Sequence, residues 1–226
     1  MADKKKIALL GAGTMGIGIA QMFAQAGHEV KLIYVYDDKV RARPREAMEA
    51  NLNILREEGV QDAGRSPPSW TGSVGPSLFG GGCGVCHVVI ECIVEDLAVK
   101  QTTSEAGRLC PLSTVLTTNT SAISVTEIAG KAVHKERIIG THFWNPAYLV
   151  PLVEVIRTKY VSEETVAAVF QLMEEAGKKP VLVKKDVRAS WPTGCSTRFS
   201  AKRSLSWKMG SPKPGMWTTP SSTDSV

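Results

Sequence analysis

The most constraining feature of the chain is a glycine-rich turn near its N-terminus. Residues 6–16 read KIALLGAGTMG, a short apolar run followed by three spaced glycines. Gly11 permits a tight turn, Gly13 leaves no Cβ where a diphosphate approaches the backbone, and Gly16 lets the following helix pack on the strand. Such a turn also occurs for structural reasons alone, so its flanking elements carry the prediction that it holds a dinucleotide.

The helix after this turn and an acidic pair after the next strand extend the prediction. Thr14 and Met15 open the predicted helix, where N–H groups and the helix dipole favour phosphate. Asp37 and Asp38 come about twenty residues beyond the loop, where a carboxylate binds the adenosine ribose and repels the extra phosphate of NADP. We therefore predict NAD as the cofactor. The aspartate that does not face the cofactor would instead cap the helix that begins near Lys39.

Composition argues against several other classes of protein. The chain has 226 residues, 43% of them hydrophobic, enough for one full domain and part of another. Its net charge of +5 comes from scattered lysines and arginines, so we expect no nucleic-acid partner. No apolar run has the length of a membrane span and no signal-peptide core is present, so we expect a cytoplasmic protein without a membrane partner. Five cysteines, an odd number, favour free thiols over a disulfide framework.

Apolar periodicity predicts strands that alternate with helices. This order is typical of the α/β class, with a doubly wound, mostly parallel Rossmann-type sheet. We assign residues 1–187 to this domain and residues 188–226 to a tail that lacks apolar periodicity and is expected to be disordered. Strands are expected at 6–10, 30–36, 88–94, 114–118, 138–142, 151–156 and 180–183, and helices at 14–26, 39–58, 97–109, 124–128 and 163–176.

Residues 63–87 break this alternation. They contain proline- and glycine-rich stretches with neither period, and an irregular loop of this length is unusual inside a compact domain. The segment ends in Cys83-Gly84-Val85-Cys86-His87, a c-type haem attachment pattern. We expect neither a haem nor a metal site, because no export signal and no further ligands accompany the pattern.

A candidate pair for proton transfer follows the predicted strand at 138–142. His142 comes at the carboxyl end of that strand, the edge where sheets of this class bind ligands, and Glu154 lies among apolar residues of the next strand. A histidine oriented by a buried carboxylate is a competent general base for a hydroxyl. The alternative is a hydrogen-bonded core histidine with an unrelated glutamate. Ser121 would hold a substrate oxygen, or else serve only as a turn or cap residue.

Five sequence blocks together resemble the L-3-hydroxyacyl-CoA dehydrogenase family, which includes 3-hydroxybutyryl-CoA dehydrogenases. The resemblance covers roughly residues 5–62 and 88–187. It implies hydride transfer between NAD and the C3 hydroxyl of an acyl-CoA, with His142 as general base, Glu154 orienting it and Ser121 contacting the substrate oxygen. It further implies that Glu95, Lys100 and Asn119 lie near the nicotinamide and its ribose. The blocks are GAGTMG at 11–16, VEDLAVK at 94–100, NTS at 119–121, HFWNP at 142–146 and LVEVI at 152–156.

The chain departs from the family pattern in two places. Asp37 and Asp38 fall two or three residues late, so that Tyr34 stands near the position of the expected acid. After Val187 the family continues into a Pro-Gly-Phe-x-x-Asn-Arg-Leu helix, which carries a catalytic asparagine and opens an all-helical substrate and dimerisation domain. This chain instead reads RASWPTGCS, so we expect the usual homodimerisation domain to be absent or scrambled.

A change of reading frame accounts for both irregular segments. Plausible codons for residues 188–196, regrouped one nucleotide earlier, become CCG GGC TTC GTG GCC AAC AGG CTG CAG. They then encode Pro-Gly-Phe-Val-Ala-Asn-Arg-Leu-Gln, the missing motif. The same operation on residues 65–75 gives Ala-Val-Ala-Ala-Val-Leu-Asp-Arg-Val-Arg-Gly, a helical sequence. We therefore hypothesise that residues from about 63 to 87, and all residues after Val187, are read out of frame.

Three functions are consistent with these motifs. The first is an NAD-dependent 3-hydroxyacyl-CoA dehydrogenase of fatty acid or butanoate metabolism, impaired in this chain because the catalytic asparagine and the helical domain are missing. On this hypothesis NAD binding is weak or absent and turnover negligible. The second is a related dehydrogenase of a free hydroxyacid, of the L-gulonate or carnitine type. The third is a non-catalytic NAD-binding protein similar to the lambda-crystallins.

The reading-frame hypothesis is tested by the coding DNA. Resequencing across codons 60 to 90 and 185 to 226 is expected to reveal an insertion or deletion near each junction, relative to close relatives. A gene without such changes contradicts the hypothesis. So does robust oxidation of a 3-hydroxyacyl-CoA by purified protein of this sequence, because the hypothesis predicts negligible turnover.

Overall fold

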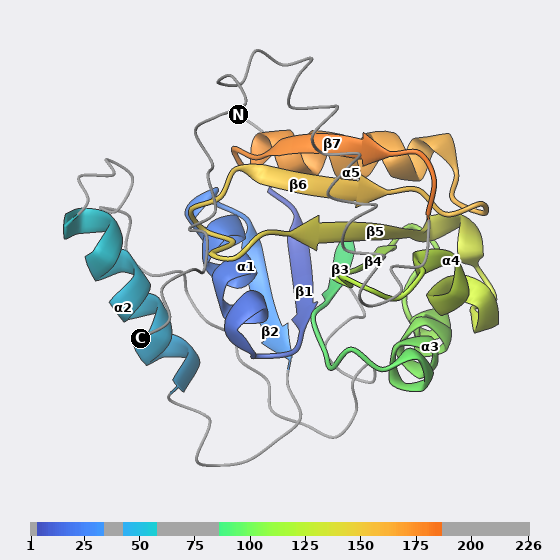
Figure 1. Cartoon of the computed structure of the whole chain (residues 1–226), viewed down its shortest axis with the longest axis horizontal. Helices are drawn as coiled ribbons and strands as arrows, with labels where there is room; N and C mark the ends of the chain where they lie inside the picture. Colours follow the sequence, from blue (N-terminus) through green and yellow to red (C-terminus); the bar gives the residue numbers. More distant parts are fainter. Residues whose placement is uncertain (1–3, 34–42, 58–85, 187–226) are drawn as a thin grey trace, which may run out of the picture. The chain divides into compact units, whose positions relative to one another are not determined.

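A single seven-stranded sheet organises the described part of the chain. The computed structural model describes residues 4–33, 43–57 and 86–186. The strand order is β2-β1-β3-β4-β5-β6-β7 (Figure 1). The strands are β1 (Lys6–Leu10), β2 (Glu29–Ile33), β3 (Val88–Glu91), β4 (Val115–Thr118), β5 (Ile138–Phe143), β6 (Leu152–Ile156) and β7 (Lys179–Val183).

The first five strands are parallel because a helix or a helical segment returns the chain between successive strands. The principal helices are α1 (Thr14–Gln25), α2 (Arg43–Glu57), α3 (Leu97–Ala106), α4 (Val125–Ile128) and α5 (Glu163–Glu175). None of the helices in the described ranges is both long and apolar enough to cross a bilayer.

The pairing of β5 with β6 is antiparallel, and Figure 1 shows their arrows pointing in opposite directions. Only residues 144–151 connect these two strands, too few for a crossover helix, so the chain turns back on itself. The register places His142 opposite Glu154. After β6, helix α5 returns the chain so that β7 runs parallel to β6. The sheet is therefore mostly parallel, as predicted.

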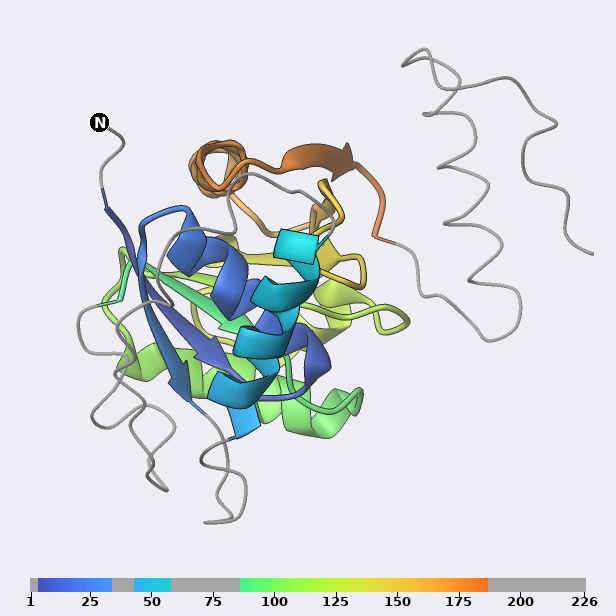
Figure 2. The ribbon, with the colours of Figure 1, turned by 90° about the vertical axis from the view of Figure 1, so that its left-hand side faces the viewer.

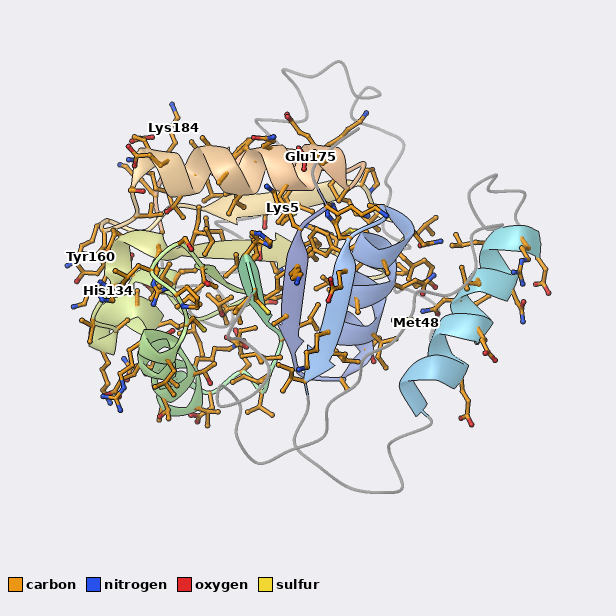
Figure 3. All side chains as sticks on the ribbon, turned by 180° about the vertical axis from the view of Figure 1, so that it is seen from behind. Lys5, Met48, His134, Tyr160, Glu175 and Lys184 are labelled. Atoms are coloured by element: carbon orange, nitrogen blue, oxygen red, sulfur yellow. The ribbon has the colours of Figure 1, made fainter. Side chains whose placement is uncertain are left out.

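Alternating side chains of the strands supply two hydrophobic cores, one on each face of the sheet. Ile7 and Leu9 of β1 join a core with apolar residues of α1, α2 and α5, whereas Ala8 and Leu10 join the core on the opposite face. Helices α1 and α2 lie side by side (Figure 2). Met48, which is buried, lies on the side of α2 that faces α1 (Figure 3).

Most predicted elements agree with the structure to within a few residues. Strand β3 is shorter than the predicted 88–94, because Cys92 and Ile93 already leave the ladder after Glu91. The described part of helix α2 covers Arg43–Glu57, and the predicted start at Lys39 lies outside the described residues. Gly27 and Gly177 adopt positive φ angles just beyond α1 and α5, a conformation that commonly ends a helix. Residues 188–226 and most of 63–87 lie outside the described ranges.

Candidate functional site

The glycine-rich turn has the tight geometry that its sequence predicts. Gly11 adopts a φ of +106°, and a Cβ added there would lie 2.5 Å from the carbonyl oxygen of Cys92. A Cβ on Gly16 would lie 1.9 Å from the carbonyl oxygen of Gly11. A Cβ on Gly13, by contrast, would meet no atom within 4 Å. Gly11 and Gly16 are therefore required by the protein's own packing, whereas Gly13 faces open space.

This open space fits a diphosphate. Helix α1 starts at Thr14, and its N-cap, Gly13, has no side chain to bind the first-turn N–H groups of Thr14 and Met15. Those N–H groups and the helix dipole suit an anion. Strand β1 lies between β2 and β3, so the loop opens where the order of strands reverses, the usual cofactor position in such sheets. The predicted ribose ligands Asp37 and Asp38 lie outside the described residues.

Three predicted residues, Ser121, His142 and Glu154, form one continuous hydrogen-bonded line. The Nδ1 atom of His142 lies 2.8 Å from Oε2 of Glu154, and its Nε2 atom lies 3.0 Å from Oγ of Ser121. The Glu154 side chain is 6% exposed and the His142 side chain 18%, so the carboxylate is shielded while the imidazole remains accessible. An ionised carboxylate only accepts hydrogen bonds, so in a neutral imidazole this contact favours the proton on Nδ1 and leaves the lone pair on Nε2.

The loop that carries Ser121 is held against the end of β5. The Asn119 side-chain oxygen accepts a hydrogen bond from the backbone N–H of Phe143 at 3.0 Å, and the Asn119 backbone N–H donates to the Glu91 carbonyl at 2.8 Å. Asn119 therefore joins β3, β4 and β5 at the edge where His142 lies. Its side-chain oxygen already has this partner within the protein.

Glu95 holds the centre of the same loop. Its Oε1 atom accepts hydrogen bonds from Thr120 Oγ1 at 2.5 Å and from the backbone N–H groups of Ser121 and Ala122, each at 3.0 Å. Burial acts to raise the pKa of the Glu95 carboxyl, but these hydrogen bonds and the charge of Lys100 together hold the pKa below its ordinary value. Glu95 is therefore an ionised anchor for the backbone around Ser121.

Lys100 lies beneath this loop and has no exposed surface. Its Nζ atom is 2.7 Å from Oε1 of Glu91 and 3.4 Å from Oε2 of Glu95. Glu91 is also buried, and it accepts further hydrogen bonds from Thr118 Oγ1 at 2.6 Å and from the Ile93 N–H at 2.8 Å. The structure therefore places Lys100 between Glu91 and Glu95, both of which accept hydrogen bonds from the loop that begins at Asn119.

Sequence reasoning missed two buried charged residues near the site. Glu91 has a recognisable signal in the sequence, since it is the one acidic residue within the otherwise apolar strand predicted at 88–94. Lys178 donates to the carbonyl oxygens of Ala147 and Val150 at 2.6 and 2.9 Å, and burial lowers its pKa to about 8. It thereby fixes the loop that follows the His142 strand, and nothing in the local sequence indicates this contact.

The remaining part of the haem-like pattern has a structural role. Nδ1 of His87 accepts a hydrogen bond from the Lys6 N–H at 2.9 Å, next to the pairing of β1 with β3. The described residues contain no group of three or more His, Cys, Asp or Glu arranged to hold a metal ion. Cys83 lies outside the described residues.

The sequence of the chain is similar to those of 3-hydroxyacyl-CoA dehydrogenases. Residues 6–187 match a domain family described as 3-hydroxyacyl-CoA dehydrogenase, NAD binding domain. The chain is 38% identical over 188 residues to the probable 3-hydroxybutyryl-CoA dehydrogenase of Bacillus subtilis (strain 168). That match covers 79% of this chain and 62% of the relative, so the chain spans less than two thirds of the relative's length.

Solved structures have the same fold. The (S)-3-hydroxybutyryl-CoA dehydrogenase of Ralstonia eutropha superimposes with a TM-score of 0.74 at 27% identity, covering 93% of this chain and 74% of that protein. An NAD⁺-dependent dismutase, the 5-dehydrogenase of 5-formyl-3-hydroxy-2-methylpyridine 4-carboxylic acid, superimposes with a TM-score of 0.72 at 26% identity. This superposition covers 92% of this chain and 66% of the dismutase.

The different surroundings of Gly13 and Gly16 predict different effects of alanine. We expect Gly16→Ala to lower the free energy of unfolding by about 1–3 kcal/mol, because its Cβ overlaps the backbone of Gly11. Gly13→Ala is expected to change it by less than about 0.5 kcal/mol while weakening NAD binding. Urea denaturation and NAD titration measure the two effects. Equal destabilisation by both substitutions contradicts this assignment.

The lowered pKa of Glu95 predicts a pH-dependent contribution to stability. A carboxyl with a lower pKa in the folded state stabilises the fold above its unfolded-state pKa, and loses this effect as the pH falls through the folded-state pKa. We expect Glu95→Gln to destabilise the protein above about pH 5 and progressively less below about pH 4. Urea denaturation at several pH values measures this difference. Glu105→Gln, at an exposed position on α3, is the matched control. A Glu95→Gln effect independent of pH contradicts the prediction.

Proposed function

We propose that this chain, which belongs to the 3-hydroxyacyl-CoA dehydrogenase family, carries residues for NAD binding and for proton transfer. The proposed reaction is the oxidation of the 3-hydroxyl group of a 3-hydroxyacyl-CoA. The observation that carries the proposal is the line of Ser121, His142 and Glu154 at the end of β5. The glycine turn lies at the corresponding end of the parallel strand β1. Both features therefore lie at one edge of the sheet, where a cofactor and a substrate would meet.

The chain's own residues supply proton transfer. His142 takes the proton of the substrate hydroxyl at Nε2, the ring atom that faces Ser121 Oγ. Glu154 accepts the Nδ1 proton at 2.8 Å, which fixes the tautomer and stabilises the imidazolium that forms. Ser121 Oγ lies 3.0 Å from Nε2, so the same hydroxyl is placed to contact the substrate oxygen. Three side chains, from β5, β6 and the loop after β4, thereby act together on the hydroxyl oxygen of the substrate.

The cofactor supplies what these residues lack. NAD, held by the turn at Gly11, Gly13 and Gly16 and by the N-terminus of α1, would accept the hydride that leaves C3. The described domain contributes alignment to this step, and Gly11 lets the turn pass close to the backbone of Cys92. Glu95 and Lys100 contribute through the Ser121 loop. Asn119 contributes through its bond to the β5 backbone.

A free hydroxyacid is the second candidate substrate class. The structural similarity to a dehydrogenase of a pyridine carboxylic acid is the observation that keeps it, because that relative is named for an acid without CoA, although its position 5 carries a formyl group. The same Ser121–His142–Glu154 line would serve either class, since the reacting group is a hydroxyl in both. We favour the acyl-CoA because the matched domain family and the 38% identical relative are both named for CoA substrates. A cytoplasmic location and a homodimer formed through a further helical domain remain predictions.

The proposal is tested in a chimera that avoids the irregular segments. Residues 63–87 and all residues after 187 are replaced with the corresponding parts of the Bacillus subtilis relative, and the described residues are kept. We expect this chimera to oxidise 3-hydroxybutyryl-CoA with NAD. His142→Gln in the chimera should lower kcat by about 10²–10⁴-fold, because it removes the general base. Glu154→Gln should lower kcat with little change in KM, because the imidazolium loses its counter-charge.

A substrate panel and a control variant complete this test. A substrate panel compares 3-hydroxyacyl-CoA thioesters with the corresponding free acids and with L-gulonate, which separates the two substrate classes. Glu105→Gln, an exposed substitution on α3, controls for nonspecific effects and should leave the rate unchanged. A folded chimera that binds NAD but oxidises no hydroxy compound contradicts the proposal and favours a non-catalytic NAD-binding protein. Full activity of the His142→Gln chimera contradicts the role of His142.

A further inference from the structure

Asp186, three residues beyond β7, contacts the loop that carries Ser121. Its Oδ2 atom accepts a hydrogen bond from Ser124 Oγ at 2.7 Å and another from the backbone N–H of Thr126 at 2.6 Å. Ser124 and Thr126 lie 62 and 60 positions before Asp186 in the sequence. One carboxylate oxygen therefore ties the chain that leaves β7 to the end of the loop between β4 and α4.

The loop is held at successive points along its length. Asn119 attaches its start to β5, and Glu95 binds the N–H groups of Ser121 and Ala122 at its centre. The centre is linked to the end, because Thr120 Oγ1 also accepts the Ile123 N–H at 3.1 Å, one residue before Ser124. The contact with Asp186 completes this series. A shift at Ser124 would therefore reach Ser121 through residues that are already bonded to one another.

Helix capping alone does not require Asp186. Helix α4 has only four residues, and Ser124 already caps it by accepting the Glu127 N–H at 3.2 Å. The same Ser124 hydroxyl donates its proton to Asp186, so its orientation is set from both sides. Ser124 is 6% exposed, which shields this bond from competition with water. Asp186 thus fixes the residue that ends the Ser121 loop.

We propose that Asp186 is a positioning residue for the Ser121–His142 pair, acting through Ser124 and Thr126. The inference rests on the proposed function for its significance, since Ser121 and His142 are the groups assigned there to the substrate hydroxyl. It adds that the 3.0 Å contact between Ser121 Oγ and His142 Nε2 depends on a carboxylate from the far end of the sheet. The course of the chain immediately after β7 is thereby coupled to the geometry of the site.

The test uses the ¹⁵N-labelled full chain and requires no turnover. Amide hydrogen exchange is measured at Thr126, Ser121 and Ala122, and the imidazole ¹⁵N resonance is measured at His142 Nε2. We expect Asp186→Ala to accelerate exchange at all three amides, on the order of ten- to a hundred-fold at Thr126, and to shift the Nε2 resonance. Asp186→Asn keeps an acceptor oxygen without the charge, so it should change the same readouts less.

Ser162→Ala is the matched control. Ser162 caps α5 by accepting the Thr165 N–H at 3.1 Å, so its loss removes a comparable bond away from the Ser121 loop. This variant should leave the His142 resonance unchanged. If Asp186→Ala does not fold, the same readouts on Asp186→Asn decide. Faster exchange confined to Thr126, with Ser121, Ala122 and His142 as in the unsubstituted chain, overturns the proposal. An inactive chimera would overturn the proposed function instead, because these NMR readouts do not depend on catalysis.

Discussion

The antiparallel register between β5 and β6 is the constraint on which the candidate site depends. Because only residues 144–151 connect the two strands, β6 must run back along β5, and the register places Glu154 beside His142. A buried carboxylate next to an imidazole fixes which ring nitrogen holds the proton. The remaining nitrogen, Nε2, faces Ser121. The chemistry proposed for the domain therefore follows from the one place where the parallel order of the sheet is interrupted.

The second constraint is the set of carboxylates that hold the Ser121 loop. Glu95 binds its backbone at the centre, Glu91 supports Lys100 beneath it, and Asp186 bonds the residues at its end. Glu91 and Lys100 are buried, and charged groups out of water are stable only when they are paired and hydrogen-bonded. The loop is therefore held in place by the protein's own hydrogen bonds, and Ser121 lies within hydrogen-bond distance of His142. Such rigidity suits a group that must align a hydroxyl for proton transfer.

Much of this arrangement could be predicted from the sequence. The glycine spacing at Gly11, Gly13 and Gly16 has a direct steric meaning, and the structure places each glycine in the environment expected of it. His142 and Glu154 could be assigned to neighbouring strands, although the register that pairs them depends on the length of the connection. The Asp186 contacts could not be predicted, because a hydrogen bond across 62 positions depends on how the whole sheet folds. For Asp37, Asp38 and the residues after 187, the sequence alone supplies the interpretation.

The central claim is that Glu154 fixes His142 as a base at Nε2. The most direct measurement is the ¹⁵N NMR spectrum of the neutral imidazole of His142 in the folded chain, which distinguishes the two tautomers. The account predicts the proton on Nδ1, with Nε2 unprotonated, and predicts that Glu154→Ala removes this preference. A neutral His142 that carries its proton on Nε2 in the unsubstituted protein would contradict it, because that nitrogen would then have no lone pair to accept a proton from a substrate.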